Sequence, residues 1–366
     1  MRELVKIVTV DKISPIKGAD FIELAHIGGW QCVVKKGEFN PDGNDRGVFY
    51  EIDSFLPYED ERYAFLRGRN QRILNGKEGM RIKSMRLRKC LSQGLLLPLN
   101  EFSEEELKAD DLAKALDVVK WELPIPAQLR GQMRRYFPSF IHKTDQERAQ
   151  NCSKAIKNRV GELFEVTTKL DGSSCSIYHN NGDIGVCSRN IELKLFDDKR
   201  PCFKKGWDWL LLKLFNKKPV FNKVNTENTF VKTAWKSGLL DALANGEFGN
   251  ICVQGELLGP NIQKNREGLE DHQFFVFDIW DIDKQRYMTP KERWRLFSTL
   301  ELYSDIKHVP VVDIKFVLNH TIEELLVMAD GPSLNHPIRE GLVFKHMDGG
   351  FSFKAVSNKF LLKEED

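Results

Sequence analysis

A lysine at the end of a strand-like run is the first residue whose position favours covalent chemistry. The run is "VTTKLDGSSCSIYH", in which Lys169 is followed by Asp171 and Gly172, a pair that turns the chain. A fixed lysine amine that is desolvated, or close to other cations, has a pKa below its usual value of about 10.4, and the uncharged amine is a nucleophile. A surface hairpin with a solvated lysine explains the same four residues, so K-x-D-G alone is weak evidence.

Further groups suited to phosphate chemistry follow in the C-terminal half of the chain. "CSRN" places Arg189 after the next strand-like run, where a guanidinium suits a phosphate, and "VQGELLG" places Glu256 at a strand end. "FFVFDIWDI" offers alternate aromatic side chains, of which Phe277 or a neighbour could stack on a base. "REGLVFK" and "FSFKAVSNKFLLK" supply further carboxylate and ammonium groups, namely Glu340, Lys345, Lys354 and Lys359. Taken singly, each is explained as well by core packing or a solvated surface.

Together these residues provide what nucleotidyl transfer to a lysine requires. A triphosphate repels nucleophiles, so cations such as Arg189 and Lys354, with a divalent metal ion, must offset charge on the α-phosphate and pyrophosphate. Carboxylates such as Glu340 suit a hard cation that keeps several of its waters.

The order of the motifs resembles that of the covalent nucleotidyltransferases, which include ATP-dependent DNA and RNA ligases and mRNA capping enzymes. "KLDG", "SRN", "GEL", "FVFDI", "EGLVFK" and "FSFKAVSNKF" are similar to motifs I, Ia, III, IIIa, IV and V of that family, and they cover most of residues 160–362. The resemblance implies ATP as the nucleotide, AMP covalently bound to Lys169, and Mg²⁺ or Mn²⁺ as the metal ion.

The resemblance also implies a role for each matched residue. Lys169 would become adenylylated, Lys354 would grip the α-phosphate, and Arg189 would hold phosphate and sugar. Phe277, or Phe275, would stack on adenine. The implied catalytic residues are Lys169, Lys354 and Arg189. The implied metal ligands are Asp171, Glu256 and Glu340. The implied nucleotide-binding residues are Lys169, Asp171, Gly172, Arg189, Glu256, Phe277, Lys354 and Arg148.

Two positions depart from the family pattern or allow a second explanation. Motif V usually reads K-x-K, but here Val356 stands at the position of the second lysine. Lys359 is a candidate substitute, although on a continuous strand its side chain would point to the opposite face from that of residue 356. In the entry segment "FPSFIHKTDQERAQN", Arg148 or Lys143 would contact the β- and γ-phosphates. A helix cap at Thr144-x-x-Glu147 explains the same segment without chemistry.

The elements that must position these residues form two groups. Short strand-like runs parted by turn residues predict a small β-barrel: "LVKIVTV", "FIELAHI", "QCVVKK", "RGVFYEI" and "GLLLPL". Residues 103–157 are charged and predict helices, starting at the Ser-x-x-Glu capping box of "SEEELKADDLAKAL". The linker-like "ELPIPAQLRG" lies within this stretch, at residues 122–131, and marks the predicted domain boundary; strands and helices of an α+β domain built on antiparallel sheets come after it.

The N-terminal part resembles the OB domain of the Deinococcus–Naegleria type of RNA ligase. On this basis we expect an α+β protein with an OB-fold RNA-binding domain and helical linker at 1–125 and a ligase-type nucleotidyltransferase domain at 126–366. The resemblance implies ATP-dependent sealing of RNA 3′-OH and 5′-phosphate ends, in nicked duplexes with an RNA 3′-OH strand, through lysyl-AMP and RNA-adenylate. The basic "RIKSMRLRK" would hold the duplex by its phosphates, unless it is only a strand with a solvated face. Alternatives are a DNA ligase, an mRNA-capping guanylyltransferase or a non-catalytic RNA-binding protein.

Bulk composition fits this prediction. The chain has 366 residues, a net charge of +2, and seven cysteines. No apolar run is long enough to span a membrane, and the scattered cysteines are typical of a reducing compartment. We therefore expect a soluble intracellular protein, in the cytoplasm, and the resemblance to RNA ligases implies that it acts as a monomer.

Overall fold

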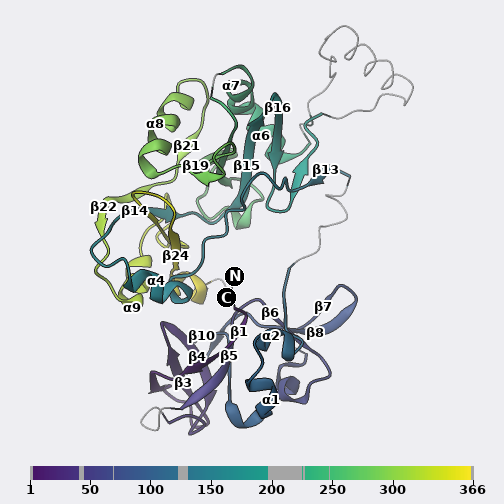
Figure 1. Ribbon diagram of the computed structural model, residues 1–366, viewed down its shortest axis with the longest axis vertical. Helices are drawn as coiled ribbons and strands as arrows, with labels where there is room; N and C mark the ends of the chain where they lie inside the picture. Colours follow the sequence, from purple (N-terminus) through teal and green to yellow (C-terminus); the bar gives the residue numbers. More distant parts are fainter. Residues whose placement is uncertain are drawn as a thin grey trace.

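The computed structural model describes residues 3–40, 45–68, 70–122, 131–196, 225, 227–246 and 248–363. Two domains lie one above the other (Figure 1). The predicted boundary between residues 125 and 126 lies outside the described residues. In the described part of the chain, no helix is long and apolar enough to cross a membrane.

The N-terminal domain is built from short antiparallel strands. These are β1 (Val5–Thr9), β2 (Lys12–Pro15), β3 (Ile22–Ile27), β4 (Trp30–Lys35), β5 (Arg46–Tyr50), β6 (Ser54–Pro57), β7 (Gln71–Leu74), β8 (Lys77–Arg81), β9 (Ser84–Leu87), β10 (Cys90–Gln93), β11 (Leu95–Pro98) and β12 (Val119–Lys120). Their sheets run β1-β5-β11, β2-β3-β4, β12-β6-β8-β7 and β9-β10. The helical elements are η2 (Glu61–Leu66), η3 (Leu99–Glu101), α1 (Glu104–Leu107) and α2 (Leu112–Ala115).

Strand β5 shows why this sequence forms a barrel-like domain. Its side chains alternate between two cores, because successive residues of a strand point to opposite faces. Phe49 packs with Trp30 in one core, whereas Val48 and Tyr50 belong to the other. The Tyr50 hydroxyl, which is buried, meets the Tyr63 hydroxyl at 2.8 Å.

The C-terminal domain contains two large sheets. Strands β13 (Met133–Tyr136), β17 (Ile191–Leu193), β16 (Asp183–Cys187), β15 (Ser173–Asn180), β18 (Ile251–Leu258), β19 (Gln273–Asp281) and β20 (Arg286–Tyr287) form one antiparallel sheet in this order, and β21 (Lys307–His308) joins β19 in parallel. Strands β22 (Val311–Val317), β14 (Leu163–Lys169), β23 (Gly341–His346) and β24 (Ser352–Val356) form the second, antiparallel sheet.

Helices cover these sheets. They are η4 (Ala149–Cys152), α4 (Ser153–Lys157), α6 (Thr229–Lys236), α7 (Leu239–Asn245), η5 (Gln263–Asn265), α8 (Pro290–Leu300), α9 (Ile322–Ala329) and α10 (Asn358–Lys363). One core lies between the first sheet and α6, α7 and α8, and another between the second sheet, α4 and α9. The predicted α+β class with an N-terminal barrel is therefore confirmed.

The predicted helical character of residues 103–157 is confirmed only at the two ends of this stretch, in α1, α2, η4 and α4. The capping box forms, with the Ser103 hydroxyl accepting from the Glu106 N–H, but α1 and α2 have only four residues each. Residues 133–136 form a strand because they find a distant partner in β17. No helix begins at Thr144 either, so the capping explanation of the entry segment fails.

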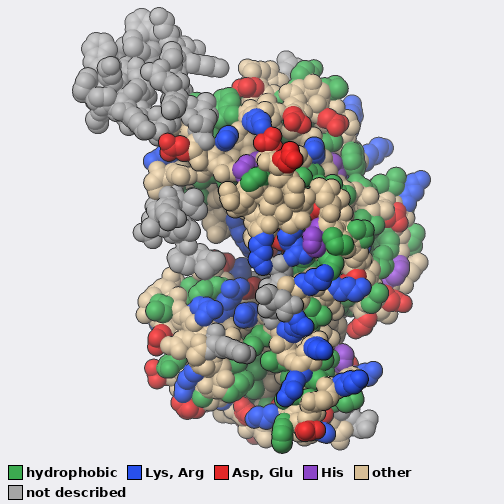
Figure 2. Space-filling model, turned by 180° about the vertical axis from the view of Figure 1, so that it is seen from behind, with side chains coloured by type: hydrophobic (Ala, Val, Ile, Leu, Met, Phe, Trp, Pro, Cys, Tyr) green, Lys and Arg blue, Asp and Glu red, His purple; other side chains and the backbone are tan. Residues whose placement is uncertain are grey.

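The two domains contact each other directly. The Asn151 side-chain amide donates to both carboxylate oxygens of Glu51 at 3.0 Å, and the Arg148 guanidinium lies 5.6 Å from the centre of the Trp30 ring. A Cβ added to Gly29 would lie 2.4 Å from Ile322, so the domains approach closely there. Lys and Arg side chains gather around the hollow where the domains meet (Figure 2).

Candidate active site

A cavity of about 590 Å³ lies between the two sheets of the C-terminal domain. Its walls come from the end of β14, the 188–191 turn, β18, β19, β23, β24 and the entry segment at 144–146. Nearly all of the residues predicted to act line it: Lys169, Asp171, Gly172, Arg189, Glu256, Phe277, Glu340, Lys345 and Lys354. Residues up to 185 positions apart in the sequence thus meet in one place.

Lys169 ends β14 opposite Gly341, and this pairing brings its amine to Glu340. The Lys169 Nζ donates to Glu340 Oε2 at 2.5 Å. Burial lowers the Lys169 pKa, but the carboxylates of Glu340, Glu256 and Asp171 outweigh burial and raise it above its ordinary value. The expected fall in this pKa is therefore wrong for the free protein, since three carboxylates surround the amine.

Glu256 stands on β18 beside Ser174 of β15, deep in the same cavity. Burial raises the pKa of its carboxyl to about 8, although Lys169 acts in the opposite direction. Gly172 allows the close approach of this strand, because a Cβ there would lie 2.5 Å from the Leu257 carbonyl and 2.9 Å from Glu256 Cγ. The turn after Lys169 thus requires glycine for space.

Lys354 is held by the entry segment. Its backbone N–H donates to the Glu147 carbonyl at 2.8 Å, and its Nζ lies 3.7 Å from Asp145 Oδ1. Burial and the Lys169 ammonium lower the Lys354 pKa to about 8. Asp145 also lies 3.5 Å from Arg189, so this carboxylate links two of the predicted cations. The sequence analysis did not single out Asp145, and its local sequence carries no signal for this role.

One end of the cavity suits a flat aromatic ligand. Phe277 lines the wall, whereas Phe275 is 1% exposed in the core and is excluded as a stacking partner. The Lys345 Nζ lies 5.8 Å from the centre of the Phe277 ring, donates to the Phe277 carbonyl, and lies 2.8 Å from Asp278 Oδ1. Burial lowers the Lys345 pKa to about 8.

Other predicted residues lie elsewhere. Lys359 belongs to α10, where its Nζ pairs with Asp330 at 3.3 Å, and Val356 is buried at the end of β24. The placement of Lys359 on a strand is therefore wrong, and Lys359 does not line the cavity as a substitute for the second lysine of motif V. Arg148 packs on Trp30 and does not line this cavity. Its backbone nevertheless forms an isolated parallel β-bridge with Lys354.

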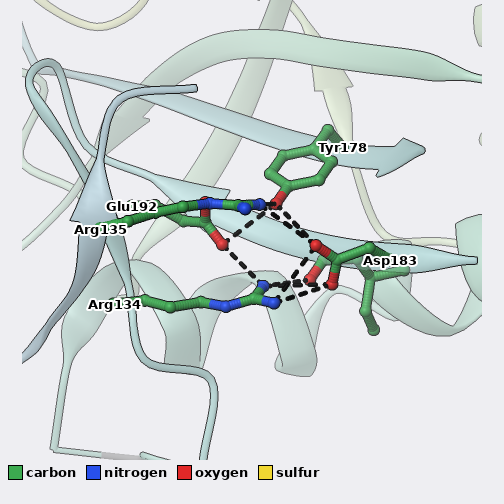
Figure 3. A network of polar contacts seen from close by, with 6 residues as sticks. Arg134, Arg135, Tyr178, Asp183 and Glu192 are labelled. Atoms are coloured by element: carbon green, nitrogen blue, oxygen red, sulfur yellow. Dashed lines mark hydrogen bonds and ion pairs between the residues drawn. The ribbon is translucent and has the colours of Figure 1, made fainter. Parts of the chain in front are cut away.

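A charge network around the buried Glu192 anchors the strand that leads into the entry segment (Figure 3). Glu192 is fully buried and pairs with Arg135 and, at 2.7 Å, with Arg134, while the Tyr178 hydroxyl donates to it at 3.0 Å. Both arginines also reach Asp183 at 3.1 Å. These contacts join β13 to β16 and β17, the two strands that are connected by the turn containing Arg189.

The predicted metal ligands can supply some, but not all, of the ligands that a hard cation needs. Among the described residues, no three His, Cys, Asp or Glu side chains converge as a ready-made metal cage. Asp171, Glu256 and Glu340 instead surround the Lys169 amine. A cation of the Mg²⁺ or Mn²⁺ kind is usually held by one or two carboxylates together with waters and substrate phosphates, and this donor set can provide that.

Arg266 was missed by the sequence analysis. Its Nε lies 4.0 Å from Asp171 Oδ2, and its guanidinium lies 4.6 Å from the centre of the Phe360 ring. It follows β18 at a turn and carries no motif signature, so only the fold reveals that it neighbours Asp171.

Comparisons with known proteins agree with this geometry. An OB-fold domain model matches residues 4–99, and the RNA ligase family model matches residues 162–356. The chain is similar to solved structures of Naegleria gruberi RNA ligase, one with PPi and one of a lysine-to-alanine mutant with ATP and Mn, each at 42% identity and TM-score 0.79 over 100% of both chains. A mutant with AMP and Mn matches at 42% identity and TM-score 0.80 over 100% of both chains. No curated protein matches. The family model covers more than half of the chain and the structural match all of it, so the chain belongs to the RNA ligase family.

Proposed function

We propose that the protein is an ATP-dependent RNA ligase that works through a lysyl-AMP intermediate at Lys169. The observation that carries the proposal is the Lys169 amine in a cavity that also presents Lys354, Arg189 and an aromatic wall at Phe277. The ATP and Mn bound by the similar Naegleria gruberi proteins support the choice of nucleotide and of a divalent cation.

The reaction takes three steps. Lys169 Nζ, after losing a proton, bonds to the α-phosphorus of ATP while the bond from that phosphorus to pyrophosphate breaks. A 5′-phosphate oxygen of RNA then bonds to the same phosphorus, and the bond to Lys169 Nζ breaks. Finally, the 3′-OH attacks the 5′-phosphorus, loses its proton, and AMP departs as the phosphodiester bond forms.

The side chains of the cavity would bind and orient the nucleotide. Lys354 and Arg189 would offset phosphate charge, and Phe277 would stack on adenine. Arg148, beside the Lys354 backbone, would contact the leaving phosphates. A bound divalent cation would add positive charge at the phosphates, held by carboxylates from the set Asp171, Glu256 and Glu340.

The proposed RNA substrate is a nicked duplex with an RNA 3′-OH strand. The basic residues of β9 and its flanks support this: Lys83, Arg86, Arg88 and Lys89 are exposed. They would contact backbone phosphates and therefore hold the duplex largely without reading its sequence. Action as a monomer in the cytoplasm completes the proposal.

Mass spectrometry of the intact protein tests the chemistry directly. With ATP and Mg²⁺ or Mn²⁺, we expect one added adenylate on the peptide that contains Lys169, and none in a Lys169→Ala variant with an unchanged circular dichroism spectrum. GTP in place of ATP separates a ligase from a guanylyltransferase. The proposal fails if folded wild-type protein acquires no adenylate, or if only GTP labels it.

A further inference from the structure

A cluster of four buried charged side chains joins the two sheets of the C-terminal domain, and the reaction proposed above gives none of them a role. The two cations are Arg293 of α8 and Lys345 of β23, and the two carboxylates are Glu165 of β14 and Asp278 of β19. Their side chains are between 0% and 7% exposed. We refer to these four residues as the inter-sheet cluster.

Arg293 contacts both sheets through one guanidinium. It donates to Glu165, on the sheet that contains β14, and its Nη1 lies 3.7 Å from Asp278 Oδ1, on the sheet that contains β19. Its Nε donates to His308 Nε2 at 3.2 Å, on β21, which is paired with β19. Lys345 makes a second connection between the sheets, because its strand is paired with β14 and its Nζ lies 2.8 Å from Asp278 Oδ1.

The strands that the inter-sheet cluster joins carry residues of the nucleotide cavity. Glu165 precedes Lys169 by four positions on β14, and the unbroken pairing of β14 with β23 places both side chains on the same face. The separation along the strand is about 13 Å. Asp278 directly follows Phe277 on β19, and Phe277 lines the cavity. The inter-sheet cluster therefore sets the distance between the strand that bears the nucleophile and the strand that bears the proposed stacking residue.

Stability alone does not account for charged residues at these positions. Charges are costly to remove from water, and replacing a buried ion pair with well-packed apolar side chains is often neutral or stabilising. Hydrogen bonds differ from apolar packing because they are short and directional, so they fix distances and orientations. The proposed chemistry depends on such a distance, since a misplacement of about 1 Å can slow a reaction about 100-fold.

We infer that Arg293 is a positioning residue for the first step of nucleotidyl transfer. By holding β14 to β19, it keeps the Lys169 amine at the distance from Phe277 that places the α-phosphorus of a stacked nucleotide in line for attack. Arg293 does not line the cavity, so its effect reaches the reacting atoms through the strands. The inference rests on the proposed ligase function.

Arg293→Lys tests the inference in the full-length protein. Lysine keeps the positive charge but replaces the planar fork of donors with a single ammonium, so the geometry at Glu165 and Asp278 is lost. We expect the kcat of lysyl-AMP formation to fall about 100-fold, because the amine is misplaced. The KM for ATP should stay unchanged, because every residue that lines the cavity is still present.

Arg286→Lys is the matched control. Arg286 forms a two-bonded ion pair with Glu292 in the first turn of α8, with both N–O distances at 2.7 Å, and it does not line the cavity. The substitution therefore disturbs an arginine that contacts the same helix without touching the inter-sheet cluster. It should form lysyl-AMP at the wild-type rate.

The double variant Glu165→Gln with Arg293→Met separates positioning from stability. Because it removes both charges of one buried pair, its free energy of unfolding should recover much of what Arg293→Met loses. Its rate of lysyl-AMP formation should nevertheless stay low, because β14 is still not held to β19. Recovery of the rate together with stability would show that Arg293 acts on folding alone and would overturn the inference.

RNA that already carries the 5′-adenylate gives a readout for one step only. Its sealing requires attack by the 3′-OH and not by Lys169, so Arg293→Lys should seal it at the wild-type rate. Equal slowing of both reactions, or a raised KM for ATP with unchanged kcat, would mean a general disturbance of the cavity and would contradict the inference. Lysyl-AMP formation at the wild-type rate in Arg293→Lys would contradict it too, whereas absence of lysyl-AMP in wild-type protein would refute the proposed function.

Discussion

Arg293→Met tests the buried ionic cluster of Arg293, Glu165, Asp278 and Lys345, of which Lys345 lines the nucleotide cavity. Arg293 is 0% exposed and donates to Glu165, which is 1% exposed on β14, the strand that ends in Lys169. Its Nη1 also lies 3.7 Å from Asp278, the partner of Lys345. Methionine keeps the side chain long and apolar but leaves Glu165 without its closest cation.

The expected cost follows from burial. Removing one partner of a buried ion pair costs about 3–5 kcal/mol, because the other charge stays desolvated and uncompensated. For a domain of this size, each kcal/mol lowers the melting temperature by about 2–4 °C, so the expected fall is about 6–20 °C. Urea unfolding followed by circular dichroism measures the free energy, and calorimetry measures the melting temperature.

The pH dependence gives a second check. Burial raises the Glu165 pKa, but Arg293 and Lys345 together hold it below the ordinary value of 4.5. Folding thus favours the ionised form in wild-type protein, and this stability is present above about pH 4.5 and lost below it. Without Arg293 the folded pKa rises, so the gap between variant and wild type should be largest at neutral pH and narrow as pH falls.

The double variant Glu165→Gln with Arg293→Met decides whether the pair interacts as described. Because it removes both charges, it should recover much of the lost stability. The reasoning is refuted if Arg293→Met unfolds within about 1 kcal/mol of wild type, or if the two substitutions simply add.

Three further predictions concern neighbouring positions. Burial lowers the His308 pKa from 6.5 to about 4, so the stability of wild type should fall as pH drops through this range, and His308→Gln should remove much of that fall in urea unfolding. Gly341→Ala places a Cβ 2.2 Å from the Ala355 carbonyl between β23 and β24, so it should reduce lysyl-AMP formation, whereas Gly131→Ala, which meets no atom within 4 Å, should not. Phe277→Leu should raise the KM for ATP about ten-fold, and an unchanged KM would remove Phe277 from the nucleotide site.

Part of the candidate site follows from sequence because Lys169 and Glu340 stand at strand ends, whereas Glu256, predicted at a strand end, lies inside β18. Lys169 ends β14, Glu340 directly precedes β23, and antiparallel pairing of these strands places them together. Glu256 reaches the same cavity because β18 pairs with the strand that follows the Lys169 turn. Each of these positions is set by a short motif, and the sheets then bring the motifs to one cavity.

The position of Lys359 was mispredicted because a strand was extended too far. Strand β24 stops at Val356, and the Ser357 hydroxyl accepts a hydrogen bond from the Phe360 N–H, as an N-cap does. The helix that follows turns Lys359 towards Asp330. Ser357, which precedes the apolar residues of α10, was the local signal that a helix begins here. The alternation of side chains along a strand therefore does not extend to Lys359.

Asp145, Arg266 and β13 could not be predicted for a different reason. Asp145 acquires its position from Lys354, more than 200 residues later, and from Arg189. Strand β13 exists because β17 lies beside it and Glu192 neutralises its arginines. Long-range pairing of this kind leaves no trace in local charge or hydropathy.

The sign of the Lys169 pKa shift illustrates the same limit in electrostatics. Burial alone would lower the pKa, as the sequence analysis expected, and it does so for Lys354, which lies in the same cavity. The two lysines differ in their neighbours: Glu340, Glu256 and Asp171 outweigh burial at Lys169, whereas at Lys354 the Lys169 ammonium adds to it. The three carboxylates therefore favour the protonated form of the nucleophile in the free protein, and a ligand that offsets their charge would lower its pKa. A sequence names the charged residues, but the sign of a shift depends on which of them the fold places nearest.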